Sequence, residues 1–228
     1  MARNESEEKK KVKPGKEHLI LCEGKDEWSF LVTYLNSPAL SDIPKLSTVI
    51  QVEDFGGNSN LKKQLELWTK APGFDGLKSL IVVRDAETNA EGAQQSIIHA
   101  FGAANLPQPS SPCQLMQSDS LTTGFILFPA CNNTLTNGTL EDLCLSILED
   151  TDNQALQEIN SFLAGIKEKG LRTFPREFKT KVHTYLSITD KYVSLKIGEA
   201  AKAGAFDWTS NKLQSLRDFF INMVKQSD

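Results

Sequence analysis

The chain has 228 residues, of which 39% are hydrophobic and 24% are charged, as is typical of a soluble globular protein. No run approaches the roughly 18 consecutive apolar residues of a membrane span, and the polar N-terminus lacks the apolar stretch of a secretory signal. We therefore expect no membrane partner. The four scattered cysteines form no CxxC pair, so we expect a protein of the reducing cytoplasm without a zinc site.

The net charge of −4 is unevenly distributed along the chain. Residues 1–16 contain six Lys or Arg and three Glu, so they carry +3 and the remaining 212 residues carry −7. Such a charge run is typical of a flexible, solubilising leader. A basic arm that contacts nucleic-acid phosphates is the alternative.

Strands and helices alternate through the first part of the chain. β-rich runs predict strands at residues 17–23, 47–52, 77–83 and 124–128. Apolar residues at helical spacing predict helices at residues 26–35, 61–68 and 88–104. This order predicts βαβ units, a largely parallel sheet and helices on both of its faces.

From about residue 139 onward the pattern is entirely helical. We therefore expect an α/β protein with a helical C-terminal extension, in which residues 17–228 form a single domain. In parallel sheets of this type, ligands bind at the carboxyl ends of the strands.

Acidic residues gather at three places where a predicted strand ends or a helix begins. Like charges repel, and unpaired buried charges are costly, so each cluster is either solvated or faces something positive. The clusters are Glu23, Asp26 and Glu27 in EGKDE, Asp85 and Glu87 in VVRDAE, and Glu141 and Asp142 in NGTLEDL.

Two of these clusters have a spacing that suits one hard cation. Residues i and i+2 of an extended segment point the same way, so Asp85 and Glu87 are expected to face one point. Gly24 permits a tight turn through which Glu23 and Glu27 approach each other. Carboxylate oxygens are the ligands that Mg²⁺ or Mn²⁺ prefers.

A simpler interpretation exists for each cluster taken singly. Acids at a helix start stabilise the helix dipole, and acids at a strand end are often solvated. An ion pair from Arg84 or Lys25 in the space between Glu23 and Asp85 would favour this structural interpretation.

The arrangement of strand, Glu-Gly, helix, second βα unit and strand ending in Asp-x-acid resembles the Toprim domain. That domain serves topoisomerases, primases and overcoming-lysogenization-defect (OLD) nucleases. The segments FGGNSNL, GTLEDL and KTKVHTYLS…GEAAKAGAFDW resemble a narrower, Toprim-like bacterial family of unknown function near the OLD nucleases. The resemblance covers about residues 17–225 and implies a Toprim-like fold.

The resemblance also implies roles for individual acids. Glu23 corresponds to the Toprim glutamate, which acts as general acid/base or metal ligand. Glu27 corresponds to the second acid of the OLD-type pattern. Asp85 and Glu87 correspond to the Asp-x-Asp metal ligands, with glutamate replacing the second aspartate. Glu141 corresponds to a later metal-ligating acid.

A late lysine that stabilises transition-state charge corresponds to Lys181, with Lys179 as its competitor. Together these residues imply a Mg²⁺- or Mn²⁺-dependent nuclease or phosphoryl-transfer enzyme that acts on nucleic acid. The alternative is a non-catalytic Toprim-like binding or regulatory protein that partners a separate ATPase subunit.

Two further features suggest phosphate binding. Gly56, Gly57 and Asn58 lie between a predicted strand and helix, where backbone amides can hold a phosphate, although a plain tight turn also fits. Residues 167–202 contain nine Lys or Arg and four acids, which suits either a nucleic-acid face or a solvated helix surface.

Overall fold

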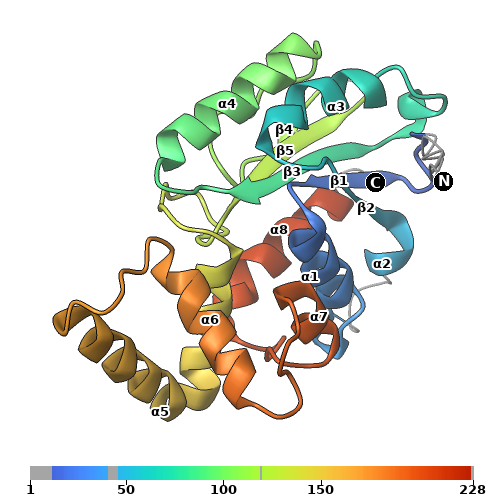
Figure 1. The fold of residues 1–228 in the computed structure, drawn as a ribbon. Coiled ribbons are helices and arrows are strands. Elements are labelled where there is room, and N and C mark those ends of the chain that lie inside the picture. Colours follow the sequence, from blue (N-terminus) through green and yellow to red (C-terminus); the bar gives the residue numbers. More distant parts are fainter. Residues whose placement is uncertain (1–11, 41–45, 119, 227–228) are drawn as a thin grey trace, which may run out of the picture.

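The computed structural model describes residues 12–40, 46–118 and 120–226. Its centre is a five-stranded sheet of order β2-β1-β3-β5-β4 (Figure 1). The strands β1 (His18–Cys22), β2 (Ile50–Asp54), β3 (Ser79–Asp85) and β5 (Thr122–Phe128) run parallel. The short edge strand β4 (Met116–Gln117) is antiparallel to β5.

Helices cover both faces of the sheet (Figure 1). α3 (Leu61–Trp68) and α4 (Ala90–Ala103) lie on one face, and α1 (Lys25–Leu35) and α8 (Gln214–Lys225) lie on the other. Side chains alternate along each strand, so Leu19 and Leu21 pack towards α3 and α4 while Ile20 and Cys22 pack towards α1. This alternation explains why every residue of β1, β3 and β5 is buried.

The C-terminal part is helical. α5 (Leu140–Glu168) kinks at Asp152, where the backbone leaves helical geometry, and α6 (Glu177–Ile188) packs against it. α7 (Ile197–Lys202) packs against α1, and a 3₁₀ turn at Asn211–Leu213 leads into α8. The remaining short elements are α2 (Leu46–Val49) and 3₁₀ turns at Pro38–Leu40, Asn58–Asn60 and Phe74–Gly76.

The predicted fold class is confirmed: the protein is α/β, with a mostly parallel sheet flanked by helices and a helical C-terminal region. The predicted strand at residues 47–52 is wrong at its start, because residues 47–49 belong to α2 and β2 begins at Ile50. β-branched residues fit either element, and the strand begins only where it pairs with β1.

No helix among the described residues is long and apolar enough to cross a membrane. The predicted flexible leader covers residues 1–16, of which residues 1–11 lie outside the described part of the chain.

Candidate functional site

The carboxyl ends of the two central strands meet at one edge of the sheet. β1 is paired with β2 on one side and with β3 on the other, so consecutive βα units extend the sheet in opposite directions from this point. Open α/β sheets bind ligands in the crevice that forms there. Cys22 aligns with Val83 in the last pair between β1 and β3, so Glu23 follows the end of β1, and Asp85 is the last residue of β3, where it pairs with Phe128 of β5.

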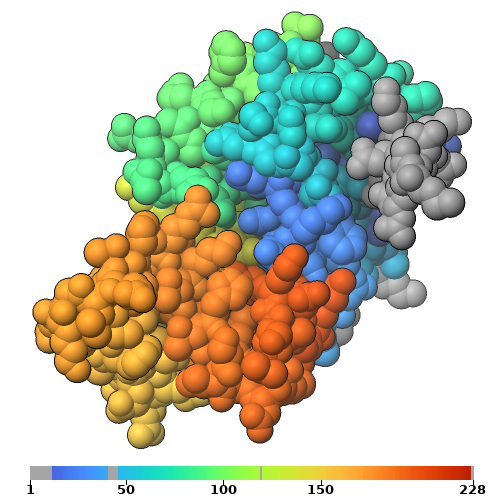
Figure 2. All heavy atoms as spheres, viewed as in Figure 1, coloured from blue at the N-terminus to red at the C-terminus, as the bar shows by residue number. Residues whose placement is uncertain are grey.

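A cleft of about 460 Å³ opens at this edge. It is formed by the start of α1, the segment after β3, the start of α5 and the start of α6. In the space-filling view the surface is hollowed where the blue residues of α1 approach the orange residues of α6 (Figure 2). The charged side chains that line it include Glu27, Asp85, Glu87, Glu141, Arg176 and Lys179.

Glu23 lies beside a buried arginine. Arg84 Nε is 3.7 Å from Glu23 Oε2, and the arginine side chain is only 3% exposed. Burial raises the pKa of Glu23, while Arg84 opposes this shift. Neither Glu23 Oε2 nor Arg84 Nη1 has a hydrogen-bond partner, so this pair is incompletely satisfied.

Asp85 is 8% exposed at the end of β3. Its Oδ1 accepts a hydrogen bond of 2.9 Å from the backbone N–H of Leu140, in the first turn of α5. Burial, then the charges of Glu27 and Glu141, raise the pKa of Asp85 to about 9. The Leu140 N–H at the start of α5 lowers the pKa of Asp85, but this one donor offsets only part of the effect of burial and of the neighbouring carboxylates.

Glu27 faces the same cleft from the first turn of α1. Burial raises the pKa of Glu27 to about 7, and the charges of Glu23, Asp26 and Glu141 add to this effect. Among the described residues, no ion pair reaches Glu27 or Asp85. The cleft is thus lined by five carboxyl groups and three basic side chains, so its acids outnumber its bases.

The two candidate lysines of α6, Lys179 and Lys181, point in different directions from the helix. Lys179 lines the cleft, with its Nζ 3.4 Å from Glu141 Oε1. Lys181 lies outside the cleft and pairs with Glu177, at 3.0 Å, beside a separate hollow against α5. Two positions on an α-helix differ by roughly 200° in direction, so the structure brings only Lys179 to the acids.

Glu87 lines the cleft, but its backbone conformation differs from the predicted one. Its φ of 55° places it in the left-handed region, so the expectation that Asp85 and Glu87 share an extended segment is wrong. An isolated antiparallel bridge to Gly138 holds this turn, with N–H···O distances of 2.8 and 2.7 Å. Glu87 still lines the cleft beside Asp85.

The glycine segment after β2 supports the backbone of Glu23. Gly56 and Gly57 both have positive φ, and the Gly57 N–H donates to the Glu23 carbonyl at 2.8 Å. Asn58 begins a three-residue 3₁₀ turn, and neither glycine nor Asn58 lines the acidic cleft. In this structure the Gly57 amide is therefore committed to the turn rather than to a phosphate.

Asp26 performs a structural task that the sequence pattern did not reveal. Its Oδ1 accepts a hydrogen bond of 2.9 Å from the Gly198 N–H, at the start of α7. Ser29 Oγ donates to the Gly198 carbonyl at 2.8 Å. These contacts fix α7 against α1, next to the cleft.

Arg176 is the cleft residue that sequence reasoning missed. Its one available signal was the basic excess of residues 167–202, which does not indicate direction. No three His, Cys, Asp or Glu side chains in the described part of the chain are already arranged to hold a metal ion. The acids therefore share a cleft without forming a closed coordination shell.

The fold and the cleft define an α/β protein with an acidic site at the carboxyl ends of a mostly parallel sheet. Residues 17–225 match the family described as "Protein of unknown function (DUF3226)", and the chain belongs to this family. Neither a search of curated proteins nor a search of solved structures gave a significant match. The expectation of a family of unknown function is confirmed, whereas the expected relation to the Toprim domain stays a prediction.

Proposed function

We propose that the protein is a Toprim-like, divalent-metal-dependent enzyme that transfers or hydrolyses phosphoryl groups of nucleic acid. The observation that carries this proposal is the convergence of Glu27, Asp85 and Glu141, from three separate elements, on one cleft. Carboxylates that share one cleft in this way are stabilised when a divalent cation binds between them.

The donor set fits Mg²⁺ or Mn²⁺. Glu27, Asp85 and Glu141 would hold the cation, some of them through its bound waters, and Glu87 lines the same cleft. Mg²⁺ retains several waters and takes only one or two carboxylates directly, so it does not require a preformed protein cage. When bound, the cation would neutralise charge on a phosphoryl group and activate a water.

The remaining groups have distinct tasks in this proposal. Lys179, which pairs with Glu141, provides a positive charge for the phosphoryl oxygens. Glu23 does not itself line the cleft; it lies next to Gly24, which does, pairs with Arg84, and is a candidate general acid/base or additional ligand. Lys181 points to a different hollow and takes no part.

Metal titration tests the proposal directly. We expect Mn²⁺ at about 100 times its Kd to raise the free energy of unfolding by about 2.7 kcal/mol. Asp85→Asn should abolish this gain and any Mn²⁺-dependent cleavage of an oligonucleotide, while Asn can still accept the Leu140 N–H bond. Glu91→Gln, an exposed carboxylate of α4, is the matched control. Wild-type protein that binds no metal would rule the proposal out.

A second candidate is a non-catalytic Toprim-like protein that regulates or binds a partner such as an ATPase subunit. Two observations favour it: Arg84 already pairs with Glu23, and Asp85 already accepts from the start of α5. Both contacts give a predicted site residue a role in stabilising the fold, which it would keep in a protein without catalytic activity. Unchanged metal affinity in Asp85→Asn, together with co-purification of an ATPase, would favour this candidate.

A further inference from the structure

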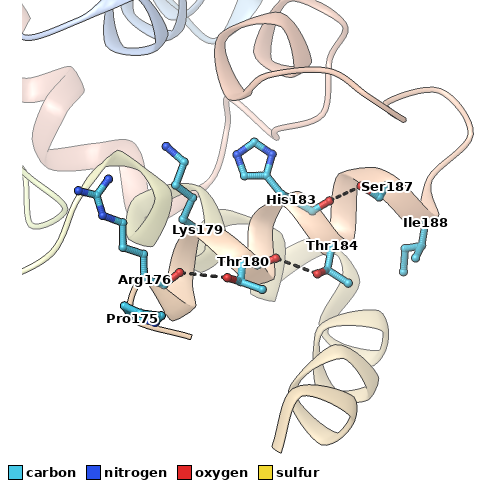
Figure 3. A pocket seen from close by; sticks show the side chains of 8 residues that line it. All are labelled: Pro175, Arg176, Lys179, Thr180, His183, Thr184, Ser187 and Ile188. Atoms are coloured by element: carbon cyan, nitrogen blue, oxygen red, sulfur yellow. Dashed lines mark hydrogen bonds between the residues drawn. The ribbon is translucent and has the colours of Figure 1, made fainter. Parts of the chain in front are cut away.

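A second hollow, of about 720 Å³, runs along the exposed side of α6 (Figure 3). Pro175, Arg176 and Lys179 line both this groove and the acidic cleft. The two hollows therefore adjoin at the start of α6, and a chain-like ligand that extends beyond that end of the groove comes next to the acidic cleft.

One edge of the groove is basic. Arg176, Lys179 and His183 follow each other at spacings of three and four residues, which places them on one side of α6 with Cβ atoms of neighbours about 5–6 Å apart. Among the described residues, no ion pair or side-chain hydrogen bond engages Arg176 or His183, and no carboxylate lines the groove. The edge therefore presents the guanidinium of Arg176, the Lys179 ammonium, which also pairs with Glu141, and the imidazole of His183.

The rest of the groove is apolar. Thr180 and Thr184 donate their hydroxyls to the carbonyls of Arg176 and Thr180, at 3.2 and 2.8 Å, as the dashed lines in Figure 3 show. Their hydroxyls are thus engaged by the helix itself, and the methyl groups remain for contact. Ile188, 61% exposed, extends this apolar surface to the end of α6.

These features match one strand of nucleic acid better than a duplex. Arg176, Lys179 and His183 supply N–H donors in one row, which suits a single line of phosphates, and the apolar part of the groove suits sugars and base faces. A duplex would present a second phosphate line to a chain whose net charge is −4. Because the groove adjoins the acidic cleft, a strand bound along α6 would end close to the carboxylates.

We propose that the α6 groove binds a single nucleic-acid strand through its phosphates and guides it into the acidic cleft. This inference rests on the proposed function, because the cleft is taken as the place where a phosphoryl group reacts. The expected substrate is a single strand, whose phosphates would contact Arg176 and His183.

Fluorescence anisotropy with labelled single-stranded DNA and RNA oligonucleotides tests the inference in EDTA, where metal plays no part. Arg176→Gln should raise Kd about fivefold and lower the slope of log K against log salt by about 0.7, the value for one phosphate contact to a single strand. Thr184→Glu should raise Kd at least about tenfold, because it places a carboxylate in the groove.

Matched controls separate the groove from general charge effects. Lys63→Gln is the control for Arg176→Gln, because it removes an exposed cation from α3, away from α6. Ser161→Glu is the control for Thr184→Glu, because it adds a carboxylate on α5 at a residue whose hydroxyl also donates to a carbonyl of its own helix. Both should bind like the wild type. Binding of either DNA or RNA that is lost only in the groove variants supports the inference.

Three outcomes would overturn it. These are no oligonucleotide binding, equal binding by the groove variants and the controls, and tighter binding of a duplex than of its single strands. Self-association that Thr184→Glu disrupts, without oligonucleotide binding, would instead assign the groove to a second copy of the chain. Strand binding without any metal binding would refute the proposed function but leave the groove as a binding site.

Discussion

The Asp85 carboxylate accepts a hydrogen bond of 2.9 Å from the backbone N–H of Leu140, 55 residues further along the chain. This bond joins the end of the central strand to the first turn of α5. It also brings Glu141, the next residue, to the same cleft as Asp85. One contact between an acid and a helix start therefore assembles two of the three convergent carboxylates.

The raised pKa values of Asp85 and Glu27 predict how stability depends on pH. Their folded-state pKa values, about 9 and about 7, lie above the ordinary 3.8 and 4.5. The folded state therefore binds more protons than the unfolded state between these limits, and stability falls as pH rises. Below about pH 4 these two carboxyl groups are protonated in both states, so they no longer lower the free energy of unfolding.

Thermal unfolding at low ionic strength without divalent cations checks this prediction. We expect Asp85→Asn to lose part of the decrease in Tm between pH 5 and pH 8, and to exceed the wild-type Tm at pH 8 by at least about 3 °C. Glu91→Gln should retain the wild-type profile. Parallel profiles for wild type and Asp85→Asn would contradict the raised pKa.

Lys179 and Lys181 are predicted to differ sharply although they are two residues apart. Lys179→Gln removes a cation that competes for Glu141, so we expect Mn²⁺ to bind about tenfold more tightly. The same substitution should reduce oligonucleotide cleavage about 100-fold, because it removes charge stabilisation at the phosphoryl group.

The control for this prediction lies on the same helix. Lys181→Gln disrupts only an i,i+4 pair with Glu177, so Mn²⁺ affinity and cleavage should stay at wild-type values. If the Lys181 variant lost cleavage and the Lys179 variant retained it, the assignment of roles from the cleft geometry would be wrong.

The buried pair of Arg84 and Glu23 is predicted to be strongly coupled. Arg84→Met leaves a largely buried carboxylate without its partner, so we expect a loss of about 2–3 kcal/mol in the free energy of unfolding at pH 8. Adding Glu23→Gln should restore part of that loss. Urea unfolding of the two single variants and the double variant measures the coupling, and additive effects would show that the pair is not an energetic unit.

Gly198 is predicted to be essential for the close approach of α7 to α1. A Cβ at this position would lie 2.6 Å from Ser29 Cβ, so Gly198→Ala should cost about 1–3 kcal/mol by forcing the helices apart. At Gly165, in α5, a Cβ would meet nothing within 4 Å, and Gly165→Ala should stabilise the helix by up to about 1 kcal/mol. Similar Tm values for the two variants would contradict this packing account.

The strand and helix order was predictable because it depends on local periodicity. The buried runs of β1, β3 and β5 and the amphipathic spacing of α1, α3 and α4 are visible in the sequence. The acids at the strand ends were predictable for the same reason, since parallel strands place their carboxyl ends at one edge. β4 and the exact start of β2 were not, because pairing rather than propensity decides them.

Sequence alone thus determined the α/β fold class and the gathering of Glu23, Glu27, Asp85 and Glu141 at one edge of the sheet. Only the tertiary structure decided which charges meet: Arg84 with Glu23, Lys179 rather than Lys181 with Glu141, and Asp26 with α7. The physical reason is that such pairings depend on the direction of a side chain and on the packing of distant helices. Neither is encoded in local spacing.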